Sequence, residues 1–258
     1  MMRIEKWYLD SLTPDGAGVI AYAARVAFGP VAANFSEGLE WRAGNPSVRG
    51  RTVFGGRLPA ASAEEILWEH RALGIAGSWR SGPAPIPTVV LHAEPAGTVE
   101  WTCLRPAAST LVQVGRERRD GQGYAERLVL TLPPHRLPIR ELRWGRFIGE
   151  EHSCIWIRWQ GPAVRNWCFH NGNLVDASMP DLNLLTWPGH RLCLEPGIVL
   201  RTGRIADTAL RGLGPLRWLL PASLRRLQET KWCSPGWLTD ASGRRHDGWA
   251  VHEVAIFR

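Results

Sequence analysis

Gly121-Gln-Gly-Tyr-Ala-Glu-Arg-Leu-Val-Leu-Thr131 has the side-chain alternation of a β-strand. Successive side chains of an extended chain point to opposite faces, so Tyr124, Glu126 and Leu128 share one face. One carboxyl group therefore lies among aromatic and aliphatic neighbours. Such a group loses hydration, and we expect its pKa to rise so that it stays protonated near neutral pH. The segment predicts a strand that presents an acid, Glu126, to an apolar surface.

Strand-like segments separated by turn residues continue on both sides of this one. The turn Thr13-Pro-Asp-Gly16 precedes an apolar strand, and Phe169-His-Asn-Gly-Asn173 has the residues of a hairpin turn. Many short strands indicate an antiparallel all-β sandwich or barrel. One helix is expected at 62–70, where Ser62 is placed as N-cap and Glu65 completes a capping box. We expect strands at 19–27, 39–41, 52–54, 74–80, 88–92, 97–104, 110–116, 124–132, 143–148, 154–160, 166–170, 192–195, 199–204 and 249–257.

A proline-rich stretch, Leu132-Pro-Pro-His-Arg-Leu-Pro138, divides the chain. Because proline interrupts sheet pairing, we expect two halves, 1–134 and 139–258. Later, at 206–228, leucines alternate with arginines in a pattern typical of a basic amphipathic helix. Two interpretations of this segment remain open: it is a helix that plugs a barrel end or packs between domains, or it contacts an anionic membrane.

Composition limits the class of protein. The chain has 258 residues, of which 45% are hydrophobic and 21% charged, as in a globular protein. Its 14 tryptophans are numerous enough to fill cores or line a cavity. The net charge of +7 comes with no nucleic-acid-binding motif, so we expect no nucleic-acid partner. Five widely spaced cysteines suit a reduced compartment, and we expect a cytoplasmic protein, at most peripheral to the inner face of a membrane.

Common catalytic motifs are missing from the sequence. The glycines at 121 and 123 resemble a dinucleotide fingerprint, but the third glycine is lacking and a strand follows. The chain has no phosphate-binding loop, no nucleophile elbow and no HExxH zinc motif. The eight histidines are dispersed without ligand spacing. We therefore expect no metal site.

Four motifs resemble those of a known superfamily. They are Trp7-Tyr8-Leu-Asp10-Ser-Leu-Thr-Pro-Asp-Gly16, Gly121-x-Gly-Tyr-x-Glu126, Trp144-Gly-Arg-Phe147 and Val251-His-Glu-Val-Ala-Ile-Phe257. Together they resemble the carotenoid 1,2-hydratase (hydroxyneurosporene synthase) and AttH-like superfamily, which is related to the lipocalin-like tocopherol cyclases. The resemblance implies two lipocalin-like antiparallel β-barrel halves with a few short helices, and no cofactor. It also implies an acid that protonates a carbon–carbon double bond of an isoprenoid or polyene.

Carried over by position, the resemblance makes Glu126 the acid, with Tyr124 beside it and Trp101 stabilising a carbocation. The expected substrate-binding residues are Trp7, Tyr8, Asp10, Trp144, Arg146, Trp156 and Glu253. The sequence departs from the family pattern in having Glu126 for an aspartate, Leu128 for an asparagine and Val99 for a histidine. Fewer polar groups remain to hold a water molecule, so cyclisation and isomerisation stay open beside hydration.

Two interpretations without catalysis also stay open. In a carrier of lipid or pigment, Glu126 is a buried structural charge paired with an arginine such as Arg146 or Arg158. In a scaffold, the basic segment at 206–228 recruits a partner or a membrane, and its binding weakens with salt.

Overall fold

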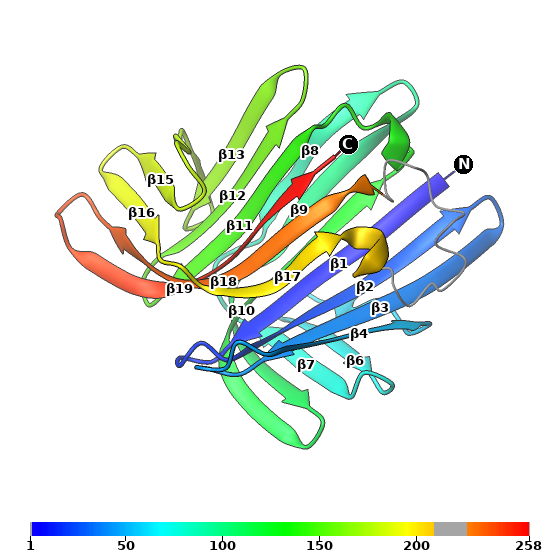
Figure 1. Ribbon diagram of the computed structural model, residues 1–258, viewed down its shortest axis with the longest axis horizontal. Helices are drawn as coiled ribbons and strands as arrows, with labels where there is room; N and C mark the ends of the chain where they lie inside the picture. The colour runs from blue at the N-terminus through cyan, green and yellow to red at the C-terminus, as the bar shows by residue number, and fades with distance from the viewer. Residues whose placement is uncertain (1, 209–225, 258) are drawn as a thin grey trace. The chain divides into compact units, whose positions relative to one another are not determined.

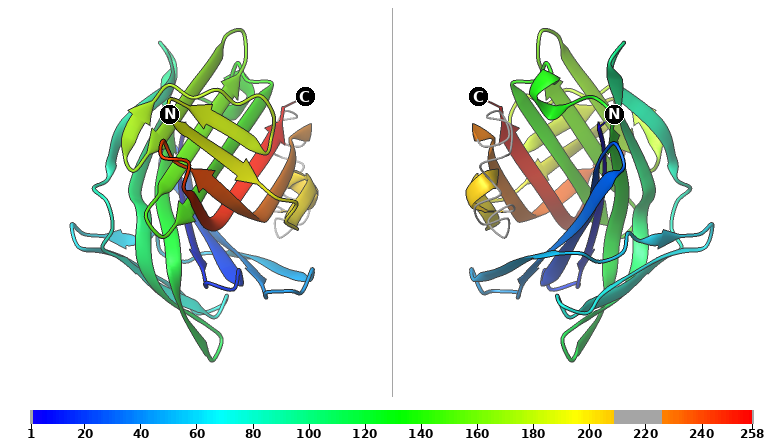
Figure 2. Two further views of the ribbon diagram at one scale, coloured as in Figure 1. Left: turned by 90° about the vertical axis from the view of Figure 1, so that its left-hand side faces the viewer. Right: turned by 90° about the vertical axis from the view of Figure 1, so that its right-hand side faces the viewer.

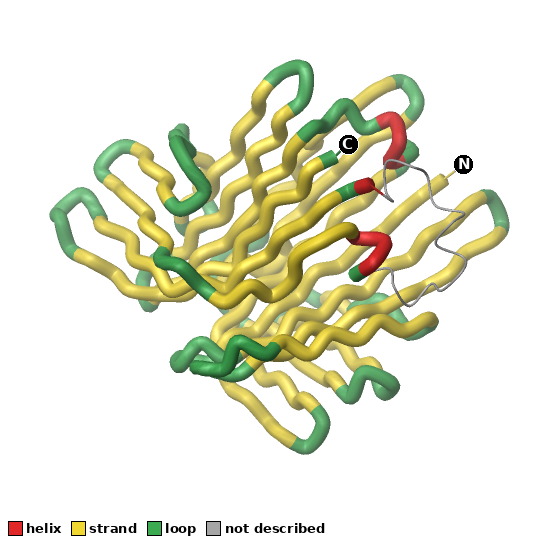
Figure 3. The backbone as a smooth tube through the Cα atoms, in the orientation of Figure 1, coloured by secondary structure: helices red, strands yellow, loops and turns green. Residues whose placement is uncertain are grey.

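The computed structural model describes residues 2–208 and 226–257, and strands make up most of that backbone (Figure 3). All strand pairings within its two sheets are antiparallel. The described residues also include two 3-10 turns, η1 (Pro134–Arg136) and η2 (Ile205–Asp207). The predicted all-β class with antiparallel halves is confirmed. No helix among the described residues has the length and hydrophobicity needed to span a bilayer.

The chain forms two compact units, each built on one sheet. Unit 1 contains the described residues 2–137 and 205–208, and unit 2 contains 138–204 and 226–257. The change from one unit to the other at Leu137–Pro138 lies within the proline-rich stretch. The segment predicted as a basic helix falls mainly on 209–225, outside the described residues. At its described ends, Ala206 lies in η2 and Gln228 begins a strand.

Unit 1 is a ten-stranded sheet in the order β4-β3-β2-β1-β10-β9-β7-β6-β5, with β8 beside β9 (Figure 1). Its strands are β1 (Met2–Leu12), β2 (Gly18–Phe28), β3 (Val31–Trp41), β4 (Val48–Phe54), β5 (Ala60–Ala61), β6 (Glu65–His70), β7 (Ile75–Arg80), β8 (Ile86–Glu94), β9 (Gly97–Val114) and β10 (Glu117–Leu130). The β9–β10 hairpin, green in Figure 2, projects at one end of this sheet. The segment predicted as a strand at 97–104 and most of the one predicted at 110–116 belong to one long strand, β9.

One face of the unit 1 sheet forms its hydrophobic core. Trp7 and Leu9, two residues apart on β1, pack in the same cluster as Ile66 and Trp68 of β6. Because β10, β9 and β7 lie between β1 and β6 in the strand order, the sheet must curl for these side chains to share one core. The opposite face of β1 is also buried, and Asp10 is 0% exposed there. A strand buried on both faces thus positions polar side chains away from water.

The helix predicted at 62–70 is wrong. Ser62 does accept hydrogen bonds from two following backbone N–H groups, as the capping pattern predicted, but Glu65–His70 is strand β6. Burial along β6 alternates, with Ile66, Trp68 and His70 buried and the residues between them exposed. This period of two belongs to a strand with one face in the core, so packing overrides the local capping signal.

Both predicted turns are hairpin turns in the structure. Gly16 adopts a φ of 87° between β1 and β2, and Asn171 and Gly172 have φ angles of 48° and 82°. Positive φ at both central residues is the requirement that favours Asn-Gly in a two-residue hairpin loop.

Unit 2 is a nine-stranded sheet in the order β14-β13-β12-β11-β19-β18-β16-β15, with β17 beside β18. Its strands are β11 (Glu141–Gly149), β12 (Ser153–Gln160), β13 (Val164–His170), β14 (Asn173–Val175), β15 (Leu184–Trp187), β16 (His190–Leu194), β17 (Ile198–Arg204), β18 (Gln228–Thr239) and β19 (Arg245–Ile256). Its core cluster includes Phe147, Trp156 and Leu238. The five cysteines, all within the described residues, form no disulfide.

Candidate active site

The three predicted catalytic residues lie together on the β9–β10 pair of unit 1. Tyr124 and Glu126 are two residues apart on β10, and Leu128 of the same face is paired with Trp101 of β9. The hydroxyl of Tyr124 donates to Oε2 of Glu126 at 2.7 Å, and Nε1 of Trp101 donates to the same oxygen. Trp101 is 2% exposed and Tyr124 is 0% exposed, whereas Glu126 is half-buried. Strand alternation and register thus place one carboxyl group between two aromatic donors.

The groups around Glu126 are held neutral. Burial, together with the nearby Cys103 and Glu126, raises the pKa of the Tyr124 hydroxyl well above its usual value. Burial also raises the pKa of the Cys103 thiol well above its usual value. A neutral phenol and indole can donate hydrogen bonds but cannot take up a proton at physiological pH. Glu126 is therefore the residue of this group suited to proton transfer.

Strand β1 adds a second carboxyl group beside the first. In its pairing with β10, Tyr8 lies opposite Glu126 and Asp10 lies opposite Tyr124. The Tyr8 hydroxyl donates to Oδ2 of Asp10 at 2.8 Å, and the ring centroids of Tyr8 and Tyr124 are 5.9 Å apart. We call Tyr8, Asp10, Trp101, Tyr124 and Glu126 the Glu126 cluster. Each of its carboxyl groups has a tyrosine hydroxyl two residues earlier in its strand.

Two glycines explain how β10 comes so close to β1. A Cβ atom at Gly123 would lie 2.0 Å from the backbone oxygen of Asp10, and one at Gly121 would lie 2.2 Å from that of Leu12. Such distances exclude any side chain without a backbone shift. The register of β10 against β9 also changes between Gly123 and Ala125. The glycines of the Gly-x-Gly-Tyr motif therefore allow close strand packing just before the residues that line the site.

The other predicted substrate-binding residues lie elsewhere. Trp7 belongs to the core face of unit 1, where its Nε1 donates to Oε1 of Glu5 at 3.0 Å. Trp156 belongs to the core of unit 2. Trp144, Arg146 and Glu253 share the face of the unit 2 sheet opposite that core. Each of these placements is within one unit. Of the predicted substrate-binding residues in unit 1, Tyr8 and Asp10 lie beside Glu126 and Tyr124, and Trp7 does not.

Glu253 is part of a buried group of charges in unit 2. The ammonium of Lys231 contacts the Glu253 carboxylate and lies 3.8 Å from Oε1 of Glu229. Arg201 donates to both oxygens of Glu229, at 2.8 and 3.0 Å. Lys231 is 1% exposed and its Nζ lies 5.3 Å from the ring centre of Trp144. The sequence did not predict this group, because β18, which carries Glu229 and Lys231, was not predicted as a strand.

A cavity of about 810 Å³ opens in unit 1 beside β6 and β7. Trp68 and His70 line it together with the loop around Arg57. His70 is 7% exposed, and neither of its ring nitrogens has a hydrogen-bond partner among the described residues. None of the predicted catalytic residues lines this cavity. It was not foreseen because 62–70 was predicted as a helix, which would point His70 differently.

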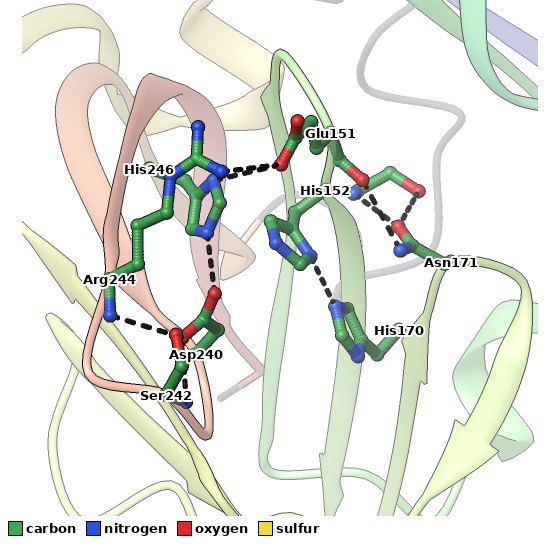
Figure 4. Close-up of polar contacts among 9 residues, drawn as sticks. Glu151, His152, His170, Asn171, Asp240, Ser242, Arg244 and His246 are labelled. Atoms are coloured by element: carbon green, nitrogen blue, oxygen red, sulfur yellow. Dashed lines mark hydrogen bonds and ion pairs between the residues drawn. The ribbon is translucent and has the colours of Figure 1, made fainter.

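Four of the eight histidines gather at one end of the unit 2 sheet, and Figure 4 shows His152, His170 and His246 of this group. The rings of His152 and His246 have centroids 4.2 Å apart, those of His152 and His170 are 5.2 Å apart, and those of His170 and His190 are 4.7 Å apart. Burial and the neighbouring histidines lower the pKa of His170 to about 4. Ligand atoms of Glu151, His152 and His246 lie within 4.8 Å of one another, so these three residues could hold a metal ion.

Strand pairing, not spacing along the chain, brings these histidines together. His170 at the end of β13 pairs with Cys154 near the start of β12, which places it beside His152. The end of β11 pairs with the start of β19 at Gly149 and Gly248, which brings the loop containing His152 next to His246. The expectation of dispersed histidines therefore described the sequence but not the fold.

No protein-family model matches the sequence, and no curated protein is similar to it in sequence. Solved structures share the fold. Kievitone hydratase from Nectria haematococca has a TM-score of 0.57 at 9% identity, covering 98% of this chain and 88% of its own. A putative AttH from Nitrosomonas europaea has a TM-score of 0.53 at 10% identity, covering 97% and 92%. CghA, in a structure with Sch210972, has a TM-score of 0.56 at 9% identity, covering 98% and 88%. The AttH part of the resemblance is thus supported at the level of fold.

Proposed function

We propose that this protein is a cofactor-independent acid–base enzyme that protonates a carbon–carbon double bond of a hydrophobic isoprenoid or polyene. The observation that carries the proposal is the convergence of the Trp101 and Tyr124 donors on Oε2 of Glu126, in buried aromatic surroundings. Alkenes are weak bases, so their protonation needs a strong acid held against an apolar substrate. Glu126 is the residue that meets both needs.

In the proposed mechanism, the Glu126 carboxyl transfers its proton to one alkene carbon, and the other carbon becomes a carbocation. Hydrogen bonds from Trp101 and Tyr124 stabilise the carboxylate left behind, which favours the transfer. The same rings offer π faces that stabilise a nearby cation. In hydration, a water oxygen bonds to the cationic carbon and its surplus proton returns to Glu126. In cyclisation, an internal double bond or hydroxyl attacks instead, and the proton lost from the product restores the acid.

The shared fold supports this proposal without specifying the reaction. One structure with this fold is named a hydratase, and another contains the compound Sch210972. Fold similarity alone does not identify an acid, because function depends on the site and not on the fold. The positions of Glu126 and Tyr124 supply a candidate acid and its hydrogen-bond donor.

The cavity beside β6 and β7 favours a second candidate, a non-catalytic carrier of a lipid or pigment. This cavity of about 810 Å³ is lined by Trp68 and Leu58, among others, but not by Glu126. A carrier would bind its ligand there, and neutralising Glu126 would leave the binding intact.

The two candidates are separated by assaying acyclic carotenoids and prenylated quinols with the wild type, Glu126→Gln and Glu64→Gln. Glu64 is an exposed glutamate outside the cluster and serves as the matched control. Mass spectrometry should show a product that has gained one water, or an isomer of unchanged mass, with the wild type and Glu64→Gln but not with Glu126→Gln. Equal turnover by Glu126→Gln would refute the assignment. Bound but unchanged lipid in all three proteins would establish the carrier.

A further inference from the structure

We propose that unit 2 carries a binding site for a divalent transition-metal ion such as Zn²⁺, with Glu151, His152 and His246 as its ligands. Two imidazoles and one carboxylate form a donor set that suits Zn²⁺ and leaves a fourth position for water or a substrate group. The proposal is independent of the Glu126 cluster, which belongs to unit 1.

The donor atoms already lie near the separation that a metal requires. With metal–ligand bonds of about 2.0–2.2 Å, donors around a tetrahedral ion are roughly 3.3 Å apart. Nδ1 of His246 lies 3.5 Å from Oε2 of Glu151, and all three ligand atoms fall within 4.8 Å of one another. Glu151 is exposed, with 54% of its side chain accessible, so it can close the remaining gap by changing rotamer.

Hydrogen bonds hold both histidines in the orientation that a metal ligand needs. Nε2 of His246 lies 2.9 Å from Oδ2 of Asp240, and Nδ1 of His152 lies 2.9 Å from Nε2 of His170 (Figure 4). Each bond occupies one ring nitrogen and leaves the other, Nδ1 of His246 and Nε2 of His152, for the ion. Metal-binding histidines characteristically have such an outer partner, often a carboxylate.

Asp240 is itself fixed in place. Its Oδ1 accepts hydrogen bonds from the backbone N–H and the hydroxyl of Ser242, at 2.8 and 2.6 Å, and from the backbone N–H of Arg244 at 3.1 Å. These donors fix the Asp240 carboxylate in a position where its other oxygen, Oδ2, faces Nε2 of His246. Hydrogen bonds therefore connect the β18–β19 turn, through Asp240, to the proposed metal ligand His246.

One cation competes for the carboxylate. Nη1 of Arg244 lies 3.7 Å from Oε2 of Glu151, and the Arg244 side chain is 65% exposed. An exposed ion pair of this kind contributes little free energy, so a bound metal ion can displace the guanidinium into solvent.

The test is metal binding by the untagged full-length protein after removal of metals with a chelator. Zn²⁺ is titrated in competition with a chromophoric chelator, and Co²⁺ replaces it for visible spectroscopy. His152→Gln, His246→Gln and Glu151→Gln are compared with His135→Gln, an exposed histidine outside the cluster. We expect one ion per chain for the wild type and His135→Gln. Each ligand variant should bind at least about 100-fold more weakly, and Asp240→Asn about 10–100-fold more weakly.

The Co²⁺ spectrum supplies a readout of the ligand set. We expect the intense bands of a four- or five-coordinate site in the wild type and their loss in both histidine variants. Circular dichroism and thermal unfolding of the metal-free proteins verify that the variants fold, and Glu151→Gln changes an exposed residue. Binding by the wild type no tighter than by His246→Gln and Glu151→Gln, or a Co²⁺ spectrum like that of the hydrated ion, would overturn the proposal.

Discussion

Tyr124 donates its hydroxyl hydrogen to Oε2 of Glu126 at 2.7 Å, from a position two residues earlier on the same strand. Because Tyr124 is 0% exposed, the hydroxyl cannot exchange this partner for bulk water. The β-strand period of two therefore does more than bury a ring, since it attaches a fixed donor to the carboxyl group that we assign as the acid.

Replacing Tyr124 with phenylalanine should slow catalysis without removing the acid. A hydrogen bond to a charged group contributes about 1.5–3 kcal/mol, and each 1.4 kcal/mol corresponds to a factor of ten in rate. We expect turnover to fall about 10- to 100-fold, measured by product formation on the substrate identified in the carotenoid and quinol assay. Tyr8→Phe removes the hydroxyl that donates to Asp10 instead, and it should lower turnover less than Tyr124→Phe does. Equal rates for Tyr124→Phe and the wild type would contradict the proposed role.

Gly123→Ala should destabilise unit 1. The new methyl group would lie 2.0 Å from the backbone oxygen of Asp10, so β1 and β10 would have to separate. We expect the free energy of unfolding to fall by about 2–3 kcal/mol, as overpacking does, measured by urea denaturation. Gly50→Ala is the control, because its methyl group would meet only the flexible end of Leu39, at 3.0 Å. Its stability should change by less than about 0.5 kcal/mol, and an equal loss in both variants would rule out this steric explanation.

Lys231→Met should be among the most destabilising changes in unit 2. The substitution removes a buried ammonium that faces the carboxylates of Glu253 and Glu229, and breaking a buried ion pair typically costs about 3–5 kcal/mol. Chemical denaturation should show a smaller loss of stability for Lys231→Met combined with Glu253→Gln than for Lys231→Met alone, because the double variant leaves one fewer unpaired buried charge. A double variant whose loss equals the sum of the two single losses would show that the contact carries no coupling.

Residues two apart in a strand were the part of the site that the sequence could predict. Tyr124 and Glu126 share a face whatever the fold, provided that the segment is extended. Tyr8 and Asp10 repeat the relationship on β1, but no strand was expected there, and only the resemblance had named these two residues. The pairing of β9 with β10 brings Trp101 next to Glu126, and only the resemblance had connected Trp101 with that residue. Local alternation therefore predicts which side chains share a face, but not which strands lie next to each other.

The features that were not predicted depend on pairing between distant segments. His152 and His246 come together because β11 pairs with β19, a register that no spacing along the chain encodes. The error at 62–70 has a different origin: Ser62 satisfies the N–H groups of a turn as readily as those of a helix, and the buried alternation of β6 decides between them. The sequence patterns identified β10, but they missed the long strands β1 and β18, and at β6 a local capping signal opposed the period of two.

Acidification should weaken the folded state through His252. Burial, and to a lesser extent the positive charge of Lys231, lower the pKa of His252 to about 4, whereas an unfolded chain has a histidine pKa of about 6.5. The unfolded state therefore binds the proton more readily. The stability that the neutral ring contributes is complete above about pH 6.5 and is lost as the pH falls towards 4. The difference between the folded and unfolded pKa values of His252 corresponds to roughly 3 kcal/mol of folding free energy.

Urea denaturation between pH 7 and pH 4.5 tests this prediction by comparing the wild type with His252→Gln and with the exposed-site control His135→Gln. The wild type and His135→Gln, whose substitution is at an exposed position of the chain, should lose stability along the same slope. His252→Gln should start less stable at pH 7, because the ring stacks on Trp232 and its Nε2 lies 3.0 Å from the Ser234 hydroxyl. Its slope should then be shallower, because the uncharged amide binds no proton, and the slope that remains should come from groups such as His170. Identical slopes in all three proteins would show that His252 does not govern the acid sensitivity of unit 2.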